Sequence, residues 1–265
     1  MGAGIAEVCA RAALDVVVVE SSEAAADAAR TRLETSLRRA QERGYQVNQD
    51  NDVRALVLTG AGDRAFTAGS DISDLDKYGD SWQYRNRMSS RRDYVHALWR
   101  IRVPVIAAIR GYCVGGGLEL ACASDLRIAA AGSRFGAGEI QWGWHGGSGQ
   151  TQFLPRLVGP GEASRLLFTG DLIDGVEAYR IGLVNELVDD ASVLTRAVEL
   201  ADKIASRGPL AVQSAKNLVR VAQGTSIETG LAYENDMFTY LMTTGDADEG
   251  RAAFAEKRVP RYEGR

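Results

Sequence analysis

The sequence predicts an α/β fold, because short apolar strand candidates alternate with helix candidates along most of the chain. From Thr151 onward the pattern is mostly helical. The 29 glycines are clustered, which indicates tight turns and close approach of backbone to a ligand. Mostly apolar runs that predict strands lie at 53–59, 104–109, 126–129 and 183–188.

The composition is that of an ordinary globular protein of 265 residues, with 45% hydrophobic and 25% charged residues. A net charge of −4 gives no reason to expect a nucleic-acid or anionic-membrane partner. No apolar run approaches the roughly 20 residues that span a bilayer, and the start has no secretory signal pattern. The three cysteines form no CxxC pair and there are two histidines, so we expect reduced thiols, no metal site and a cytoplasmic location.

Residues 1–50 are predicted to form an atypical N-terminal βα segment, with a strand at 14–19 and a helix at 23–43. Gly2-Ala3-Gly4 and Glu20 admit a dinucleotide-binding hypothesis, but a preceding strand and a third glycine are missing. Residues 1–46 resemble a truncated N-terminus of the 3-hydroxyacyl-CoA dehydrogenases. We favour a unit that packs on the core without binding NAD.

The candidate site lies around the Gly115-Gly116-Gly117 turn. The Gly116 N–H begins a helix, so this donor and the positive helix end can face a developing oxyanion. A second donor can come from the Ser70 N–H in another glycine loop, and two donors suit a thioester oxygen that becomes an enolate. Glu119 lies one turn into the helix, and if Glu139 reaches the same place the two carboxyls can divide general-base and general-acid work.

Other interpretations of these residues remain open. Each glutamate can be a surface or capping residue. His145 with Ser70 or Ser148 suggests a serine hydrolase, but the segment 146–150 misses the Gly-x-Ser-x-Gly pattern. The arginines of a predicted helix at 80–102 suggest a phosphate-binding face, although we favour a solvated one.

Four ordered stretches resemble the enoyl-CoA hydratase/isomerase (crotonase) family over about Asp52 to Arg265. They are VRALVLTGAGDRAFTAGSDI, VPVIAAIRGYCVGGGLELACASDLRIAA, FGAGEIQWGWHGGSGQTQFLPRLVG and AFAEKRVPRYEGR. The resemblance implies a crotonase spiral of repeated ββα units in residues 51–205. It also implies a helical C-terminal trimerisation region in residues 206–265, and hence a homotrimer or a dimer of trimers.

The resemblance also implies a function and a site. The activity would be addition of water across the 2,3 double bond of a trans-2-enoyl-CoA, with coenzyme A as part of the substrate and no metal or redox cofactor. Glu119 would activate the water, Glu139 would protonate the α-carbon, and Ser70 and Gly116 would form the oxyanion hole. The implied substrate- and CoA-binding residues are Ala68, Asp71, Ile72, Ser73, Gly115, Trp142 and Lys257.

The family also admits a double-bond isomerase, another enolate-forming enzyme, or an acyl-CoA-binding homologue with impaired catalysis. Two departures from its pattern bear on these alternatives. Residues 1–46 replace the usual N-terminal strands and the Arg-Asn-Ala-Leu turn that helps to hold CoA. Trp142 and Trp144 stand in a loop where the family commonly has aliphatic residues and a proline. The family's preference for acyl chain length is therefore not carried over to this chain.

Overall fold

The computed structural model describes residues 47–48, 50–62, 64–69 and 94–265, and in this part the strands form two four-stranded sheets. One sheet has the order β1-β3-β5-β8 and the other has the order β2-β4-β6-β7. Neighbouring strands are parallel, except that β6 and β7 are antiparallel. The strands are β1 Leu56–Thr59, β2 Ala65–Thr67, β3 Val105–Ile109, β4 Tyr112–Val114, β5 Leu126–Ala130, β6 Arg134–Gly136, β7 Ile173–Asp174 and β8 Glu186–Val188.

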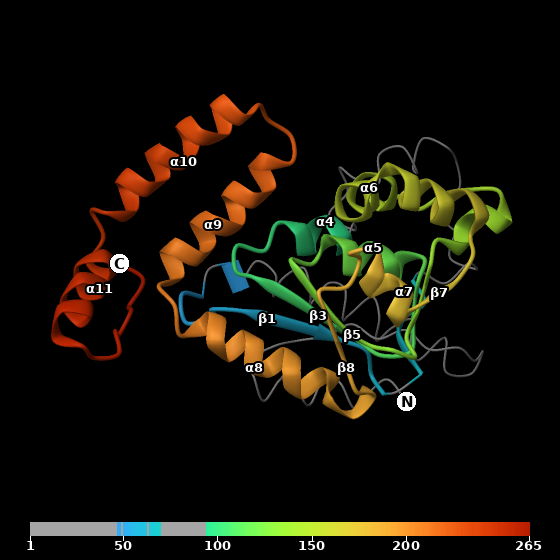
Figure 1. The fold of residues 1–265 in the computed structure, drawn as a ribbon, viewed down its shortest axis with the longest axis horizontal. Helices are drawn as coiled ribbons and strands as arrows, with labels where there is room; N and C mark the ends of the chain where they lie inside the picture. The colour runs from blue at the N-terminus through green and yellow to red at the C-terminus, as the bar shows by residue number, and fades with distance from the viewer. Residues whose placement is uncertain (1–46, 49, 63, 70–93) are drawn as a thin grey trace.

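Helices α4, α5 and α6 each follow a pair of strands, and the two strands of each pair belong to different sheets. This repetition confirms the predicted spiral of ββα units. Figure 1 shows α4, α5 and α6 on one side of the β1-β3-β5 sheet and α8 on the other. The elements before the C-terminal region are α4 Tyr94–Trp99, α5 Gly116–Ala123, η2 Gly138–Trp142, α6 Gln150–Thr169, α7 Gly175–Arg180, η3 Asp190–Ser192 and α8 Val193–Ala205.

Strand β3 shows why the sheet is covered on both faces. All five of its residues are buried, as its uninterrupted apolar run predicts for a central parallel strand. Because side chains alternate across a strand, Ala107 and Ile109 join the hydrophobic cluster that includes residues of α5 and α6. Ile106 and Ala108 join the cluster that includes residues of α8. The sheet therefore fixes α5, the helix of the candidate site, by apolar packing.

Several short elements differ from the sequence prediction. Strands β2, β4 and β6 have three residues each, in segments where the sequence pattern predicts loops or turns. Such segments carry too little pattern of their own and are held by pairing with one another. The sequence pattern predicts a short amphipathic helix from Gly161 to Gly170. Helix α6 instead begins at Gln150, and Gly159 interrupts it with φ 78° and ψ 161°.

The C-terminal region consists of α9 Pro209–Ala222, α10 Ile227–Leu241 and α11 Gly245–Glu256. Its mostly helical character is as predicted from the pattern after Thr151. The sequence pattern predicts an irregular tail over residues 249–265, but the first half of that segment belongs to α11. Helix α9 is tied to the core by Asp125, whose carboxylate pairs with Lys216 at 2.6 Å and Arg220 at 3.1 Å. Helices α10 and α11 lead away from the sheets in Figure 1.

The predicted strand at 14–19, the helix at 23–43 and residues 80–93 of the predicted helix at 80–102 lie outside the described residues. Within the part of the chain that the structure describes, no helix combines the length and apolar character needed to cross a membrane.

Candidate active site

The glycine turn before α5 meets the loop after β2. Gly115 caps α5 with φ 58° and ψ −129°, a positive-φ conformation that favours glycine. A Cβ on Gly117 would lie 2.1 Å from the Thr67 carbonyl oxygen, and one on Gly69 would lie 2.5 Å from the Gly116 nitrogen. Side chains are therefore excluded where the backbones touch, and this contact brings the segment 67–69 to the start of α5.

Glu119 lies in the first turn of α5 and is only 3% exposed. The Ser148 N–H donates a hydrogen bond to its Oε1 at 2.6 Å. A carboxylate is favoured electrostatically at a helix N-terminus, and a charge-assisted hydrogen bond of this length is a strong one. Glu119 is thus a buried carboxyl held in one place, not a surface or capping residue.

Glu139 reaches the same glycine turn from the short helix η2, in which it is half-buried. A Cβ on Gly115 would lie 3.6 Å from its Oε1 and 3.2 Å from the Ala68 carbonyl oxygen. The Gln150 Nε2 donates to both carboxylate oxygens at 3.3 Å. The structure therefore brings Glu119, Glu139, Gly115, Gly116 and Ala68 together around one turn.

The remaining predicted site residues fall into three groups. Ser70, Asp71, Ile72 and Ser73 lie outside the described residues. Trp142 ends η2 with 65% of its surface exposed, three residues after Glu139. Lys257 caps α11 with φ 55° and is exposed, and Figure 1 shows α11 well away from α5 in the same chain.

The serine-hydrolase alternative receives no support from this geometry. Ser148 is buried, and its backbone N–H is used to hold Glu119. His145 is exposed, and its Nδ1 lies 2.8 Å from the Gly146 carbonyl oxygen, the next residue along the chain. Cys113 and Cys122 are poor nucleophiles, because burial raises the pKa of Cys113 and raises that of Cys122 to about 12.

Sequence reasoning missed Gln150, the first residue of α6, which is completely buried between Glu139 and the glycine-rich segment. A polar residue at a helix start usually faces solvent. The signal that could have drawn attention to Gln150 is its position directly after a run of glycines, where backbone atoms pack closely.

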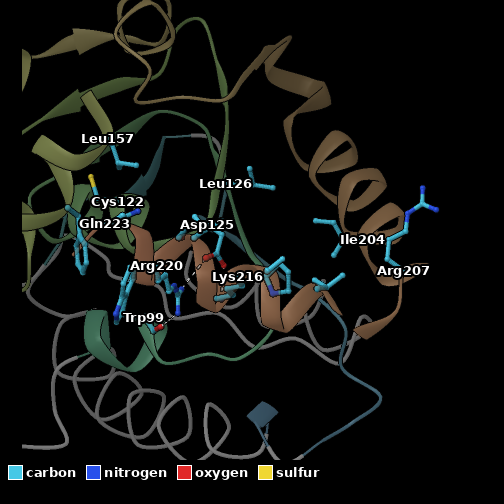
Figure 2. Close-up of a pocket in the computed structure, with 16 residues that line it drawn as sticks. Trp99, Cys122, Asp125, Leu126, Leu157, Ile204, Arg207, Lys216, Arg220 and Gln223 are labelled. Atoms are coloured by element: carbon cyan, nitrogen blue, oxygen red, sulfur yellow. Dashed lines mark hydrogen bonds and ion pairs between the residues drawn. The ribbon is translucent and has the colours of Figure 1, made fainter. Parts of the chain in front are cut away.

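A cavity of about 320 Å³ lies between the core and α9, and Figure 2 shows residues that line it. Its wall includes Trp99, Phe153 and Cys122, and the Arg220 guanidinium stacks over the Trp99 ring at 4.0 Å from the ring centroid. Neither Glu119 nor Glu139 lines this cavity. Among the described residues, no cluster of three or more His, Cys, Asp or Glu side chains could hold a metal ion.

Comparison with known proteins agrees with this fold. The enoyl-CoA hydratase/isomerase family profile matches residues 25–265, and so begins earlier than the resemblance near Asp52. The chain is 41% identical over 216 residues to the crotonyl-CoA hydratase of Syntrophomonas wolfei, covering 82% of this chain and 83% of that protein. It is 39% identical over 213 residues to the short-chain-enoyl-CoA hydratase of Clostridium acetobutylicum, covering 80% and 81%.

Among solved structures, the enoyl-CoA hydratase of Bacillus anthracis superposes with a TM-score of 0.82 at 38% identity, covering 87% of this chain and 89% of that one. A match over nine tenths of the chain, relatives near 40% identity and a shared spiral fold all point to one family. The chain therefore belongs to the enoyl-CoA hydratase/isomerase family.

Proposed function

We propose that this protein is an enoyl-CoA hydratase, which adds water across the 2,3 double bond of a trans-2-enoyl-CoA. The observation that carries the proposal is the pair of glutamates held around one glycine turn, Glu119 by the Ser148 N–H and Glu139 by the Gln150 amide. Relatives named as crotonyl-CoA and short-chain-enoyl-CoA hydratases, near 40% identity over four fifths of the chain, support the substrate class.

In the proposed mechanism, Glu119 takes a proton from water while the water oxygen forms a bond to C3 of the acyl group. The C2–C3 π electrons move to C2, and the thioester oxygen takes up negative charge as an enolate. The N–H groups of Gly116 and Ser70 stabilise that charge, since donors fixed in advance need no reorganisation during the reaction. Glu139, which is protonated at the outset, then delivers its proton to C2. The proton that Glu119 took from water returns to Glu139 after product release and restores the starting state.

This chemistry requires no redox cofactor, because addition of water transfers no electrons to or from the enzyme. The proton transfers and the enolate are served by carboxyls and backbone donors, so we propose no metal. Coenzyme A enters as part of the substrate. We place the protein in the cytoplasm, a proposal supported by the free thiols of Cys113 and Cys122 in the described part of the chain.

We also propose that the protein assembles as a homotrimer or a dimer of trimers through α10 and α11. Large hydrophobic side chains on this region are exposed in the single chain, among them Ile227 at 70%, Phe238 at 60% and Phe254 at 88%. Several large apolar side chains exposed on the same region support an association surface there. In such an assembly Lys257 would reach the CoA of an adjoining subunit.

The test is turnover of crotonyl-CoA by the wild type and by the Glu119→Gln and Glu139→Gln variants. Each substitution preserves the shape of the side chain and removes its acid or base function, so we expect kcat to fall by about 10²- to 10⁴-fold. Undiminished hydration in both variants would refute the assignment. Isomerisation of a 3-enoyl-CoA that outpaces hydration would instead identify a double-bond isomerase.

A further inference from the structure

Gln150 is the feature at the site that the proposed mechanism does not use. It is the first residue of α6 and its exposed fraction is 0%. Burying a side-chain amide costs free energy unless its N–H donors and its oxygen acceptor form hydrogen bonds. A fully buried glutamine beside a catalytic carboxyl therefore needs specific hydrogen-bond partners.

The partners of Gln150 define its orientation. Its Nε2 donates to Oε1 and Oε2 of Glu139, both at 3.3 Å, and its Oε1 accepts from the Gly146 N–H at 3.3 Å. The flipped amide would turn its oxygen toward a carboxylate and its NH₂ toward another N–H, so the two neighbours permit only one arrangement. The amide therefore links the Glu139 carboxylate to the backbone of the glycine-rich loop.

The close packing around Gln150 leaves its side chain little freedom. A Cβ on Gly146 would lie 2.8 Å from the Gln150 Cβ and 2.7 Å from its Oε1. Gly146 must therefore lack a side chain for the amide to keep its place. Two residues later the Ser148 N–H holds Glu119, so the short segment 146–150 contacts both carboxyls of the site.

We propose that Gln150 is a positioning residue for hydration, which holds the Glu139 carboxyl group beside the Gly115 turn so that, when protonated, it aims its proton at C2 of the substrate. This inference rests on the proposed function. Gln150 acts through Glu139 and does not contact the reacting atoms. Since an error of about 1 Å in placing a reacting group can lower a rate by as much as ~10²-fold, loss of the amide should reduce kcat and leave KM unchanged.

The first variant is Gln150→Met, which keeps the length of the side chain and removes both hydrogen-bonding ends. The second is Gln150→Glu, which keeps an acceptor for the Gly146 N–H but replaces the donor with a second carboxyl. We expect a loss in kcat of about 10- to 100-fold in both. The matched control is Gln152→Met on the same helix, where the glutamine is exposed and its amide contacts Thr151 and Arg156 but neither glutamate. The control should keep wild-type kcat.

A double-mutant cycle separates positioning from general structural support. In the Glu139→Gln background, Gln150→Met should cause little further loss of kcat, because the carboxylate that Gln150 positions is already absent. If Gln150→Met lowers kcat by the same factor in the wild-type and Glu139→Gln backgrounds, the proposal is overturned. It is also overturned if the Gln150 variants keep full activity while Glu139→Gln lowers kcat. If the wild type itself fails to hydrate crotonyl-CoA, the proposed function fails instead.

A crystal structure of Gln150→Glu, or of Gln150→Met, provides a readout that does not depend on activity. We expect the Glu139 carboxylate to leave its place beside Gly115. A carboxylate that keeps its wild-type position in both variants would overturn the proposal.

Discussion

Replacement of Arg127 should destabilise the protein strongly, because this residue clamps the C-terminal end of α5. Arg127 is 3% exposed, and its guanidinium donates to the carbonyl oxygens of Leu183 at 2.7 Å, Ala121 at 3.1 Å and Ser124 at 2.7 Å. Burial lowers the pKa of the guanidinium from its usual value, which reflects the cost of removing the charge from water.

The expected size of the effect follows from these contacts. Hydrogen bonds to a charged group contribute about 1.5–3 kcal/mol each, so three together amount to roughly 5–9 kcal/mol. Arg127→Met also relieves the cost of burying the charge, which is several kcal/mol. We therefore expect the free energy of unfolding to fall by about 2–4 kcal/mol and the melting temperature by about 5–15 °C.

Urea denaturation monitored by circular dichroism measures this difference. The control is Arg134→Met, since Arg134 is exposed and its bonds to the carbonyls of Gly132 and Ser133 are 3.3 Å long. The control should change stability by less than about 0.5 kcal/mol. An Arg127→Met variant as stable as the control would show that burial of the charge cancels its hydrogen bonds, and the clamp would be refuted.

Two further predictions concern the C-terminal region. The mass in solution, measured by light scattering after size exclusion, should be about three or six times the chain mass of 28.5 kDa, and the mass of a single chain would contradict the proposed assembly. Hydrogen bonds from the Arg258 side chain and the Arg261 N–H lower the pKa of Glu249 to about 2. The stabilisation from Glu249 is therefore present above about pH 4.5 and is lost as the pH falls towards 2. The difference in melting temperature between the wild type and Glu249→Gln should narrow between these two pH values. A difference that stays constant would contradict the pairing of Glu249 with Arg258.

The sequence by itself determined the α/β class, the main buried strands and the glycine turn at the centre of the candidate site. A run such as 105–109 has no polar position that could face water, so burial on both faces follows from composition. Glu119 stays close to the Gly115–Gly117 turn because three residues make almost one helical turn. These features depend on neighbours in the chain, and local pattern is enough to find them.

Only the tertiary structure decided how the carboxyls are held. The Ser148 N–H meets Glu119 across 29 residues, and Gln150 meets Glu139 across 11 residues. The three-residue strands β2, β4 and β6 could not be predicted from the sequence either. Pairing with strands distant in the sequence stabilises them more than their own β propensity does. From the sequence alone, a glutamine at the start of a helix is expected to face solvent. Gln150 is instead a buried hydrogen-bond partner of Glu139, because tertiary packing excludes water from its surroundings.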